Sequence, residues 1–248
     1  MALNQDLAPI LRQLVAANRI LAREEVVDAY GHVSVRHPHD PSRYIMSRSR
    51  SPALVNADDM MEFAIDGTPI DGDGRTPYGE RMIHGAIYEV RKDANAVVHT
   101  HSHSVIPFSI SGEPIRPVIH VAGIIGTRIP VWDIRDEFGD TDMLVRTMEQ
   151  GRAMARAAGE CDCMLMRGHG AVINGQTLKH AVMRAIYLQV NARVQSEAMR
   201  FGRYRALSPG EVALTTDTQF SPLSLDRAWE YFCSRAGVEV IDDAAANA

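Results

Sequence analysis

Three histidines stand at alternate positions, His99, His101 and His103, directly behind two valines in the segment VVHTHSH. The residues NAVV predict a buried strand, and alternate side chains of a strand point to the same face of its sheet. Thr100 and Ser102 would then take the other face. Imidazoles on one face can bind one metal ion at about 2.0–2.1 Å each, but a lasting site needs more ligands.

A further histidine with unusual neighbours is His169, which lies between two glycines in MRGHGAV, after the apolar segment CDCMLM. Glycines permit unusual backbone angles and close approach, so the imidazole can be presented sideways from the end of a strand. Taken alone, His169 is better explained as a turn histidine bonded to the backbone. Together with the HTH segment it gives three histidines with an open position, the pattern of a catalytic metal site.

The fourth candidate is Glu80, in TPYGERMIHG, which is expected at the start of a helix. A carboxylate there is stabilised by the helix dipole, and this is an adequate structural explanation. The helix could also run back and place Glu80 near His99, at the same end of the sheet. A carboxylate beside a metal could ligate it or move protons.

The elements that must position these residues follow from the apolar periodicity. Helical spacing predicts helices over 7–21, 78–92, 141–158 and 178–200. Besides the histidine strand, extended segments are expected over 30–37, 43–47, 60–65, 115–123 and, bent at 168–170, twice within 161–175. Strands and helices are mixed without strict alternation, and no dinucleotide fingerprint, repeat or linker is found. One α/β domain is therefore predicted.

The composition excludes several function classes. The 248 residues are 46% hydrophobic and 23% charged, with a net charge of -5, so nothing favours nucleic acid or an anionic membrane as a partner. The first residues lack the pattern of a secretory signal, and no stretch approaches the roughly 20 apolar residues that cross a bilayer. Three cysteines are an odd number and suggest no disulfide framework. A reducing cytoplasm fits best.

The segments YGERMIHGAIYEVRKDANAVVHTH and MRGHGAV together resemble the class II aldolase/adducin-like superfamily. Enzymes of that superfamily hold a metal on two histidines of an H-x-H strand and a third in a G-H-G turn, with a glutamate one helix upstream. The resemblance implies His99, His101 and His169 as the metal ligands and Glu80 as the acid/base. His103 lies outside this triad. It could replace His99 as the partner of His101 or touch the substrate, but the motif position favours His99, and a local cap or hydrogen bond would also explain His103.

The resemblance covers most of the chain and also implies an architecture. We expect a central, mostly antiparallel sheet flanked by helices over residues 1–205, as in the class II aldolases. Residues 206–248 would form a C-terminal extension with a short helix and a frayed tail. The family is usually homotetrameric, with sites between subunits, so a homo-oligomer is expected.

The chain departs from the sugar-phosphate aldolases at three phosphate-binding motifs. It has GHVS, SRSRSP and PYGE where those enzymes carry small hydroxyl residues and an asparagine. In SRSRS, from Ser47 to Ser51, alternation would place Arg48 and Arg50 on one face. Guanidinium groups bind flat carboxylates through paired hydrogen bonds, although a solvated basic loop is the alternative.

A decarboxylase branch of the superfamily fits these departures. Phrases such as ILAREEVVDAYGHVSVRHP, SRSRSP and RPVIHVAG resemble metal-dependent decarboxylases of aromatic hydroxy-acids, which act on compounds such as 3,4-dihydroxyphthalate and 3-hydroxy-2-methylpyridine-4,5-dicarboxylate. The resemblance implies that the metal chelates a phenolate and its neighbouring carboxylate, and that an acid protonates the ring carbon before CO2 leaves. Glu80 is the first candidate for that acid. His120, in PVIHVAG, is the second, with a buried, hydrogen-bonded histidine as the alternative.

The remaining candidates would contact substrate. They are His32, Ser34, Ser47, Arg48, Ser49, Arg50 and Tyr78, of which the tyrosine could stack on a ring or simply pack. An aldolase or epimerase of a sugar or sugar phosphate, and a non-enzymatic module like adducin, remain alternatives to a decarboxylase. The donor set suits one divalent ion per subunit, with manganese or zinc ahead of cobalt or iron by resemblance.

Overall fold

The computed structural model describes residues 7–70 and 73–241 of the chain. A seven-stranded sheet runs through its centre in the order β3-β2-β1-β4-β7-β6-β5, and neighbouring strands are antiparallel except β5 and β6. The strands are β1 (His32–Arg36), β2 (Arg43–Ser47), β3 (Met60–Ala64), β4 (Ala96–Thr100), β5 (Val131–Trp132), β6 (Cys163–Met166) and β7 (Gly170–Gly175). The predicted fold class, a mostly antiparallel sheet flanked by helices, is confirmed.

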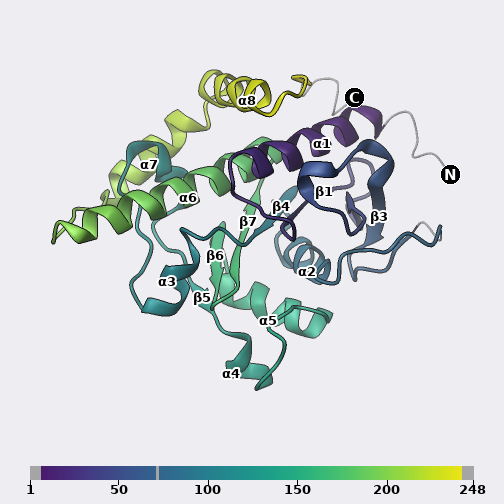
Figure 1. The fold of residues 1–248 in the computed structure, drawn as a ribbon, viewed down its shortest axis with the longest axis horizontal. Helices are drawn as coiled ribbons and strands as arrows, with labels where there is room; N and C mark the ends of the chain where they lie inside the picture. Colours follow the sequence, from purple (N-terminus) through teal and green to yellow (C-terminus); the bar gives the residue numbers. More distant parts are fainter. Residues whose placement is uncertain (1–6, 71–72, 242–248) are drawn as a thin grey trace.

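Helices cover both faces of this sheet (Figure 1). They are α1 (Ala8–Arg23), α2 (Met82–Val90), α3 (Ile106–Ser111), α4 (Ile134–Phe138), α5 (Met148–Ala158), α6 (Leu178–Arg200), α7 (Pro209–Gln219) and α8 (Pro222–Ala236). Short 3₁₀ helices are η2 (Pro52–Leu54), η3 (Ala57–Asp59) and η4 (His120–Ile125). The helices α1, α6 and α8 lie on one face and α2 and α5 on the other, so the sheet separates two layers.

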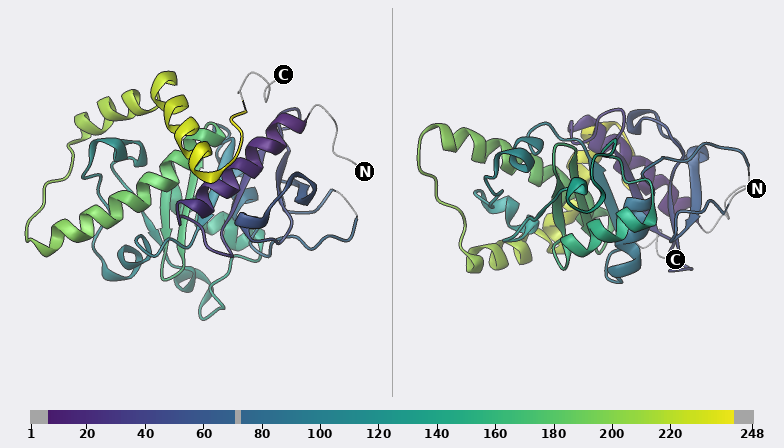
Figure 2. Two further views of the ribbon diagram at one scale, coloured as in Figure 1. Left: turned by 45° about the horizontal axis from the view of Figure 1, so that its top comes forward. Right: turned by 90° about the horizontal axis from the view of Figure 1, so that it is seen from below.

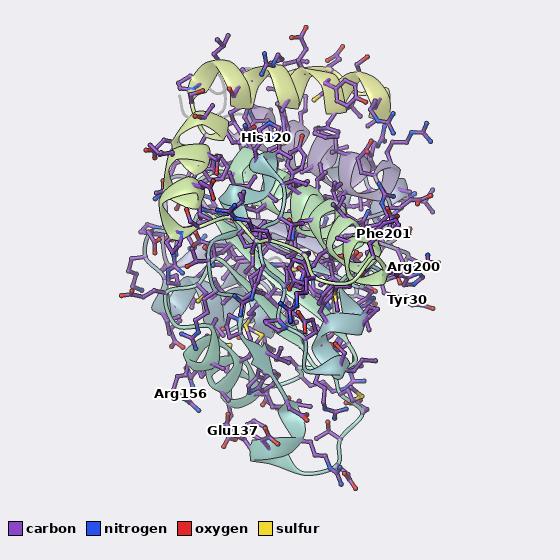
Figure 3. The ribbon with its side chains drawn as sticks, turned by 90° about the vertical axis from the view of Figure 1, so that its left-hand side faces the viewer. Tyr30, His120, Glu137, Arg156, Arg200 and Phe201 are labelled. Carbon is purple, nitrogen blue, oxygen red and sulfur yellow. The ribbon has the colours of Figure 1, made fainter. Side chains whose placement is uncertain are left out.

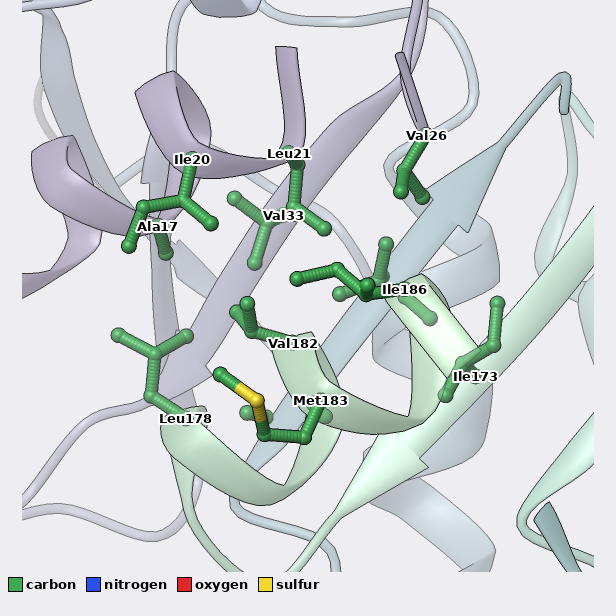
Figure 4. Packing of buried hydrophobic residues seen from close by; sticks show 14 of the residues in the cluster. Ala17, Ile20, Leu21, Val26, Val33, Ile173, Leu178, Val182, Met183 and Ile186 are labelled. Carbon is green, nitrogen blue, oxygen red and sulfur yellow. The ribbon is translucent and has the colours of Figure 1, made fainter. Parts of the chain in front are cut away.

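Strand alternation divides the apolar residues between these two layers. Val33 and Val98 point toward α1 and α6, and Figure 4 shows Val33 among residues of these helices such as Leu21 and Ile186. Val97 and Val172 point the other way, toward α2 and α5. Each layer thus has its own apolar core, and burial of those side chains is the main driving force for docking the helices.

Helix boundaries follow local capping signals. Thr177 caps α6 by accepting a hydrogen bond from the His180 backbone N–H, and α6 ends at Arg200, as predicted from its apolar spacing. The end of α6 and the start of α7 extend beyond the sheet (Figure 2), and Phe201 there is 92% exposed. Among the described residues, no helix combines the length and apolar content that crossing a bilayer requires.

The strand predicted over 115–123 is wrong. The backbone of this segment pairs with amide side chains of α6 instead of with a neighbouring strand: Asn191 bonds Arg116 and Val118, and Gln195 bonds Pro114 and Arg116. Those amides satisfy the backbone groups that a sheet would otherwise have to satisfy.

Two helix predictions also need correction. The helix expected over 141–158 begins only at Met148, because Thr147 and Gln150 form a capping box that fixes its first turn there. The C-terminal extension contains two helices, α7 and α8, rather than one short helix, and α8 buries Trp229 in the core with α1. The predicted tail lies largely outside the described residues, and the boundary at 205 stays a prediction.

Candidate metal centre

His99, His101, His169 and Glu80 converge at one end of the sheet, with one ligand atom from each lying within 4.8 Å of the others. The Nε2 atoms of His99 and His101 are 3.1 Å apart. Glu80 Oε2 lies 3.5 Å from His169 Nε2 and 3.8 Å from His99 Nε2. Atoms this close can all bond to one ion at about 2.0–2.2 Å, so the donor set fits a divalent metal.

The outward nitrogen of each ring has an acceptor that fixes its orientation. His99 Nδ1 lies 3.2 Å from the Ala171 carbonyl oxygen and His169 Nδ1 lies 2.9 Å from that of Met143. His101 Nδ1 lies 3.3 Å from the Asp28 carboxylate. These acceptors place the N–H on Nδ1, so each Nε2 presents a lone pair to the centre, as in metal-binding histidines.

The strand that carries the histidines ends earlier than predicted. His99 lies in β4, on the α2 and α5 face, but β4 stops at Thr100, so His101 follows the strand end. Thr100 and Ser102 do take the opposite face, where they bond Val26 and Gln189. His103 is exposed and outside the cluster, because the chain turns into α3 before it could join the same face.

Both glycines around His169 are required by the backbone. Gly168 has a φ of +64°, a left-handed conformation that side chains disfavour. A Cβ on Gly170 would meet the Thr100 carbonyl oxygen at 2.0 Å, so only glycine lets β7 approach β4 this closely. The predicted reason for the GHG segment is therefore confirmed.

Glu80 lies in the turn just before α2, two residues ahead of its first residue. Its Oε1 accepts a 2.9 Å hydrogen bond from the Val145 backbone N–H, which leaves Oε2 directed at the histidines. Residues 141–147, which the sequence predicts as the first turns of a helix, thus supply two backbone contacts to the site. The Met143 carbonyl oxygen bonds His169, and the Val145 N–H bonds Glu80. Sequence reasoning missed both, because backbone groups carry no residue-type signal, and it missed Asp28.

The protonation of the histidines follows from burial and neighbouring charges. Burial, reinforced by the surrounding imidazoles, lowers the pKa of His99 well below its usual value, and burial also lowers that of His101. Burial opposes protonation of His169 too, but the Glu80 carboxylate outweighs it and raises that pKa. Two of the three rings are therefore neutral and ready to bind a metal near pH 7.

A cavity of about 370 Å³ opens beside this cluster. Its walls include Tyr30, His32, Arg50, Tyr78, Glu80 and His101. The ring of His32 lies 4.7 Å from that of Tyr78 and 5.0 Å from that of His99, measured between centroids. Ser49 also lines this cavity. The structure therefore brings six of the predicted site residues to one pocket: His32, Ser49, Arg50, Tyr78, Glu80 and His101.

The two arginines of SRSRS share one partner. Arg48 Nε lies 2.7 Å and Arg50 Nη1 3.1 Å from the buried carboxylate of Asp59. Burial raises the pKa of Asp59, but the Asn56 amide and the two guanidiniums outweigh it and hold that pKa below its usual value. Arg50 lines the cavity and Arg48 does not.

Besides Arg48, three predicted site residues lie outside both the cavity and the metal cluster. Ser34 and Ser47 are buried and do not line the cavity. Ser34 lies on the same strand face as His32 but further along β1, where it bonds His84 of α2, and Ser47 interacts with Tyr78. His120 is exposed at the start of η4, and Figure 3 labels it well away from Tyr30 on the rim of the cavity. Residues 115–123 bond amide side chains of α6 instead of joining the sheet, so His120 does not line the cavity of this chain.

Comparison with known proteins agrees with this geometry. The chain is 33% identical over 213 residues to decarboxylase tropJ of Talaromyces stipitatus, covering 81% of this chain and 80% of that protein. It is 29% identical to 3,4-dihydroxyphthalate decarboxylase of Terrabacter sp., covering 91% and 97%. An L-fuculose 1-phosphate aldolase structure from Glaciozyma antarctica shares its fold, with a TM-score of 0.75, 24% identity and coverage of 93% and 91%.

The family model described as Class II Aldolase and Adducin N-terminal domain matches residues 12–196. That range contains all four residues of the metal cluster and every described strand. This chain therefore belongs to the class II aldolase and adducin N-terminal domain family.

Proposed function

We propose that this chain is a divalent-metal-dependent decarboxylase of an aromatic or pyridine ortho-hydroxy carboxylate. The observation that carries the proposal is that Arg50 lines the same cavity as Glu80 and His101. A group that can bind a carboxylate thus lines the same pocket as two residues of the metal cluster. The two relatives named as decarboxylases support the reaction class.

The charge balance around Asp59 favours an anionic substrate. Two guanidinium groups face one carboxylate, which leaves one positive charge in excess on that wall. Arg50 uses only Nη1 on Asp59, so its other nitrogens can donate to a carboxylate. Their partial exposure weakens this attraction through solvent screening, so the binding contribution is modest.

His99, His101 and His169 would hold the metal, and Glu80 lies close enough to be a fourth ligand or to act beside it. When bound, the ion would act as a Lewis acid that stabilises negative charge developing on the substrate oxygens. Histidine and carboxylate donors suit zinc, manganese, cobalt and iron.

The chain's own groups have distinct tasks in this proposal. Glu80 carries the proton for the ring carbon, because it lines the cavity and the Val145 amide occupies Oε1, which leaves Oε2, on the side of the histidines, to exchange the proton. Tyr78 and His32 flank the space where a flat ring would lie. Ser49 and Arg50 bind an anionic group of the substrate. Glu80 protonates the ring carbon that bears the carboxylate, and the phenolate becomes a ketone. The carboxylate then leaves as CO2, and the electrons of the broken C–C bond restore the aromatic ring and the phenolate oxygen.

We keep a homo-oligomer, a tetramer by family resemblance, and a cytoplasmic location as predictions. The rim residue Tyr30 is 71% exposed, as a residue at an interface between chains would be in an isolated chain. Sedimentation of the purified protein would establish the assembly.

The direct test supplies the metal-loaded protein with 3,4-dihydroxyphthalate, 3-hydroxy-2-methylpyridine-4,5-dicarboxylate and a set of sugar phosphates. CO2 release from one of the acids, abolished by a chelator, is the expected result. Aldehyde formation without CO2 would restore the aldolase alternative. If neither CO2 nor an aldehyde forms from any of these compounds, the result would count against both the decarboxylase and the aldolase reaction.

Two arginine variants test the carboxylate-binding wall. Arg50→Gln should raise KM about tenfold, because it removes a charged hydrogen bond to the substrate. Arg48→Gln is the matched control, since Arg48 binds the same Asp59 but does not line the cavity. Equal effects of the two substitutions would mean that they act through Asp59 and the fold.

A further inference from the structure

Four buried polar side chains form a continuous row of hydrogen bonds behind the cavity. His32 Nδ1 lies 2.7 Å from His84 Nε2, and His84 Nδ1 lies 2.6 Å from Ser34 Oγ. Ser34 Oγ in turn lies 2.8 Å from the Tyr88 hydroxyl. All four are at most 2% exposed, and of them only His32 reaches the cavity. The row joins β1 to α2, because His32 and Ser34 share one strand face and His84 and Tyr88 are one helical turn apart.

Packing alone does not account for this row. An apolar side chain at position 84 would also fill the space beside Tyr44, whose ring stacks with that of His84. Burial lowers the pKa of His84 to about 3, so the ring stays neutral at physiological pH. A neutral imidazole has one N–H and one acceptor nitrogen, so every hydrogen bond in the row has a direction.

The direction is set at Tyr88. Burial raises the pKa of Tyr88, so its hydroxyl keeps its proton, and among the described residues the Ser34 hydroxyl is the acceptor within hydrogen-bond distance of that proton. Tyr88 therefore donates to Ser34, and the Ser34 proton goes to His84 Nδ1. That leaves the His84 proton on Nε2, where it is donated to His32 Nδ1.

The reverse direction would leave a buried phenolic proton without an acceptor. Such a loss disfavours the reversed row by roughly tenfold or more. With His32 Nδ1 acting as an acceptor, the single N–H of a neutral His32 must be on Nε2. His32 Nε2 has no hydrogen-bond partner in the described part of the chain. It is nevertheless accessible to solvent, since it does not belong to the buried polar atoms that lack a partner. Because His32 lines the cavity, Nε2 faces the cavity.

We propose that His84, oriented by Ser34 and Tyr88, is a positioning residue that holds His32 as an Nε2–H donor toward the cavity, where His32 binds an anionic oxygen of the substrate. The nature of that oxygen, a carboxylate or phenolate, rests on the proposed function. The tautomer of His32 does not, because it follows from the protein's own hydrogen bonds.

The deciding experiment is ¹⁵N NMR of the histidine-labelled protein loaded with zinc, in which nitrogen shifts distinguish the two neutral tautomers. The expected spectrum shows both His32 and His84 with the proton on Nε2. A proton on Nδ1 of His32, or a cationic His84, would overturn the proposal. This measurement needs no substrate, so it stands even if no acid is decarboxylated and the proposed function fails.

A double variant removes the orienting end of the row without leaving an unpaired hydroxyl. Ser34→Ala with Tyr88→Phe should shift His84 and His32 toward a mixture of tautomers in the same spectrum. Tyr44→Phe is the matched control, because Tyr44 is a buried tyrosine on the same face whose hydroxyl bonds Arg81 outside the row. Unchanged tautomers in the double variant would contradict the proposed role of Ser34 and Tyr88.

Kinetics separate positioning from mere structural support. If the wild-type protein decarboxylates an acid, the double variant should raise its KM several-fold and His84→Phe about tenfold, with a smaller change in kcat and unchanged zinc content. A purely structural row predicts instead a lower melting temperature with KM unchanged. That second pattern, together with unchanged tautomers, would overturn the proposal.

Discussion

The ten residues of β1 and β4 alternate between two faces of the sheet, and the two faces differ in chemistry. Toward α1 and α6 these strands present apolar side chains, such as Val33 and Val98, and one polar residue, Thr100, at the end of β4. Toward α2 and α5 they present His32, Ser34 and His99, all buried. The first face is packed like any protein core, whereas the second places polar groups where each must find a hydrogen-bond partner.

The comparison shows that the residues that stabilise the fold and the residues that form the site lie on opposite faces of the same strands. Removing a methyl group from the apolar face should lower the free energy of unfolding without changing the site. The polar face holds its imidazoles through Asp28, Ala171 and Met143, which decide where each ring nitrogen points. Substitutions on the two faces should therefore change different measurements, and the following predictions test that separation.

The largest effect is expected for His101→Ala. Removing one of three ring ligands should abolish tight metal binding and lower activity by more than about 100-fold. The free energy of unfolding of the metal-free protein should change little, because His101 lies beyond the end of β4 and its ring bonds His99 and the partly exposed Asp28. Elemental analysis and turnover assays give the readouts. His103→Ala is the control, and a metal loss there as well would show that the cluster has been misassigned.

Asp28→Ala should weaken metal binding by roughly 10- to 100-fold, the usual range for the partner of a ligand histidine. Without that carboxylate, His101 Nδ1 loses its acceptor and the ring is free to turn. Competition with a chelating dye measures the affinity. The exposed Asp217 on α7 provides a control for the lost charge. Identical affinities for Asp28→Ala and the wild type would mean that His101 is held by other contacts.

Val98→Ala tests the opposite face of the same strand. It should lower the free energy of unfolding by about 2 kcal/mol, because it removes buried methyl groups from a packed core. Urea denaturation measures this loss. Metal content per chain should stay unchanged, and a coupled loss of metal would break the proposed separation of the two faces.

The smallest expected effect is on the pH dependence of stability, through His84. Burial lowers the pKa of His84 from 6.5 to about 3, so between these values the unfolded chain binds a proton that the folded chain does not. Stability should therefore fall as pH decreases below 6.5, and His84 contributes about 1.4 kcal/mol per pH unit to that fall. Unfolding of wild type and His84→Phe at pH 7 and 5.5 compares the slopes. Parallel slopes would show that His84 takes up its proton equally in both states.

Local sequence determined much of the fold and the core of the site. Apolar spacing predicts the helix over 178–200 with the bounds that it has, because such spacing is a property of one segment. The HTH and GHG segments identified His99, His101 and His169, since alternation along a strand and the freedom of glycine are also local properties. The fold class followed from the same patterns and the family resemblance.

Tertiary structure decided what distant partners control. Residues 115–123 looked like a strand, but Asn191 and Gln195 of α6 satisfy their backbone, so His120 lies outside the pocket. Likewise, the Val145 amide that orients Glu80 comes from a segment that reads as helix. A pattern in the sequence reports the preference of a segment, whereas the partner of a buried polar group is fixed only when the chain brings remote residues together.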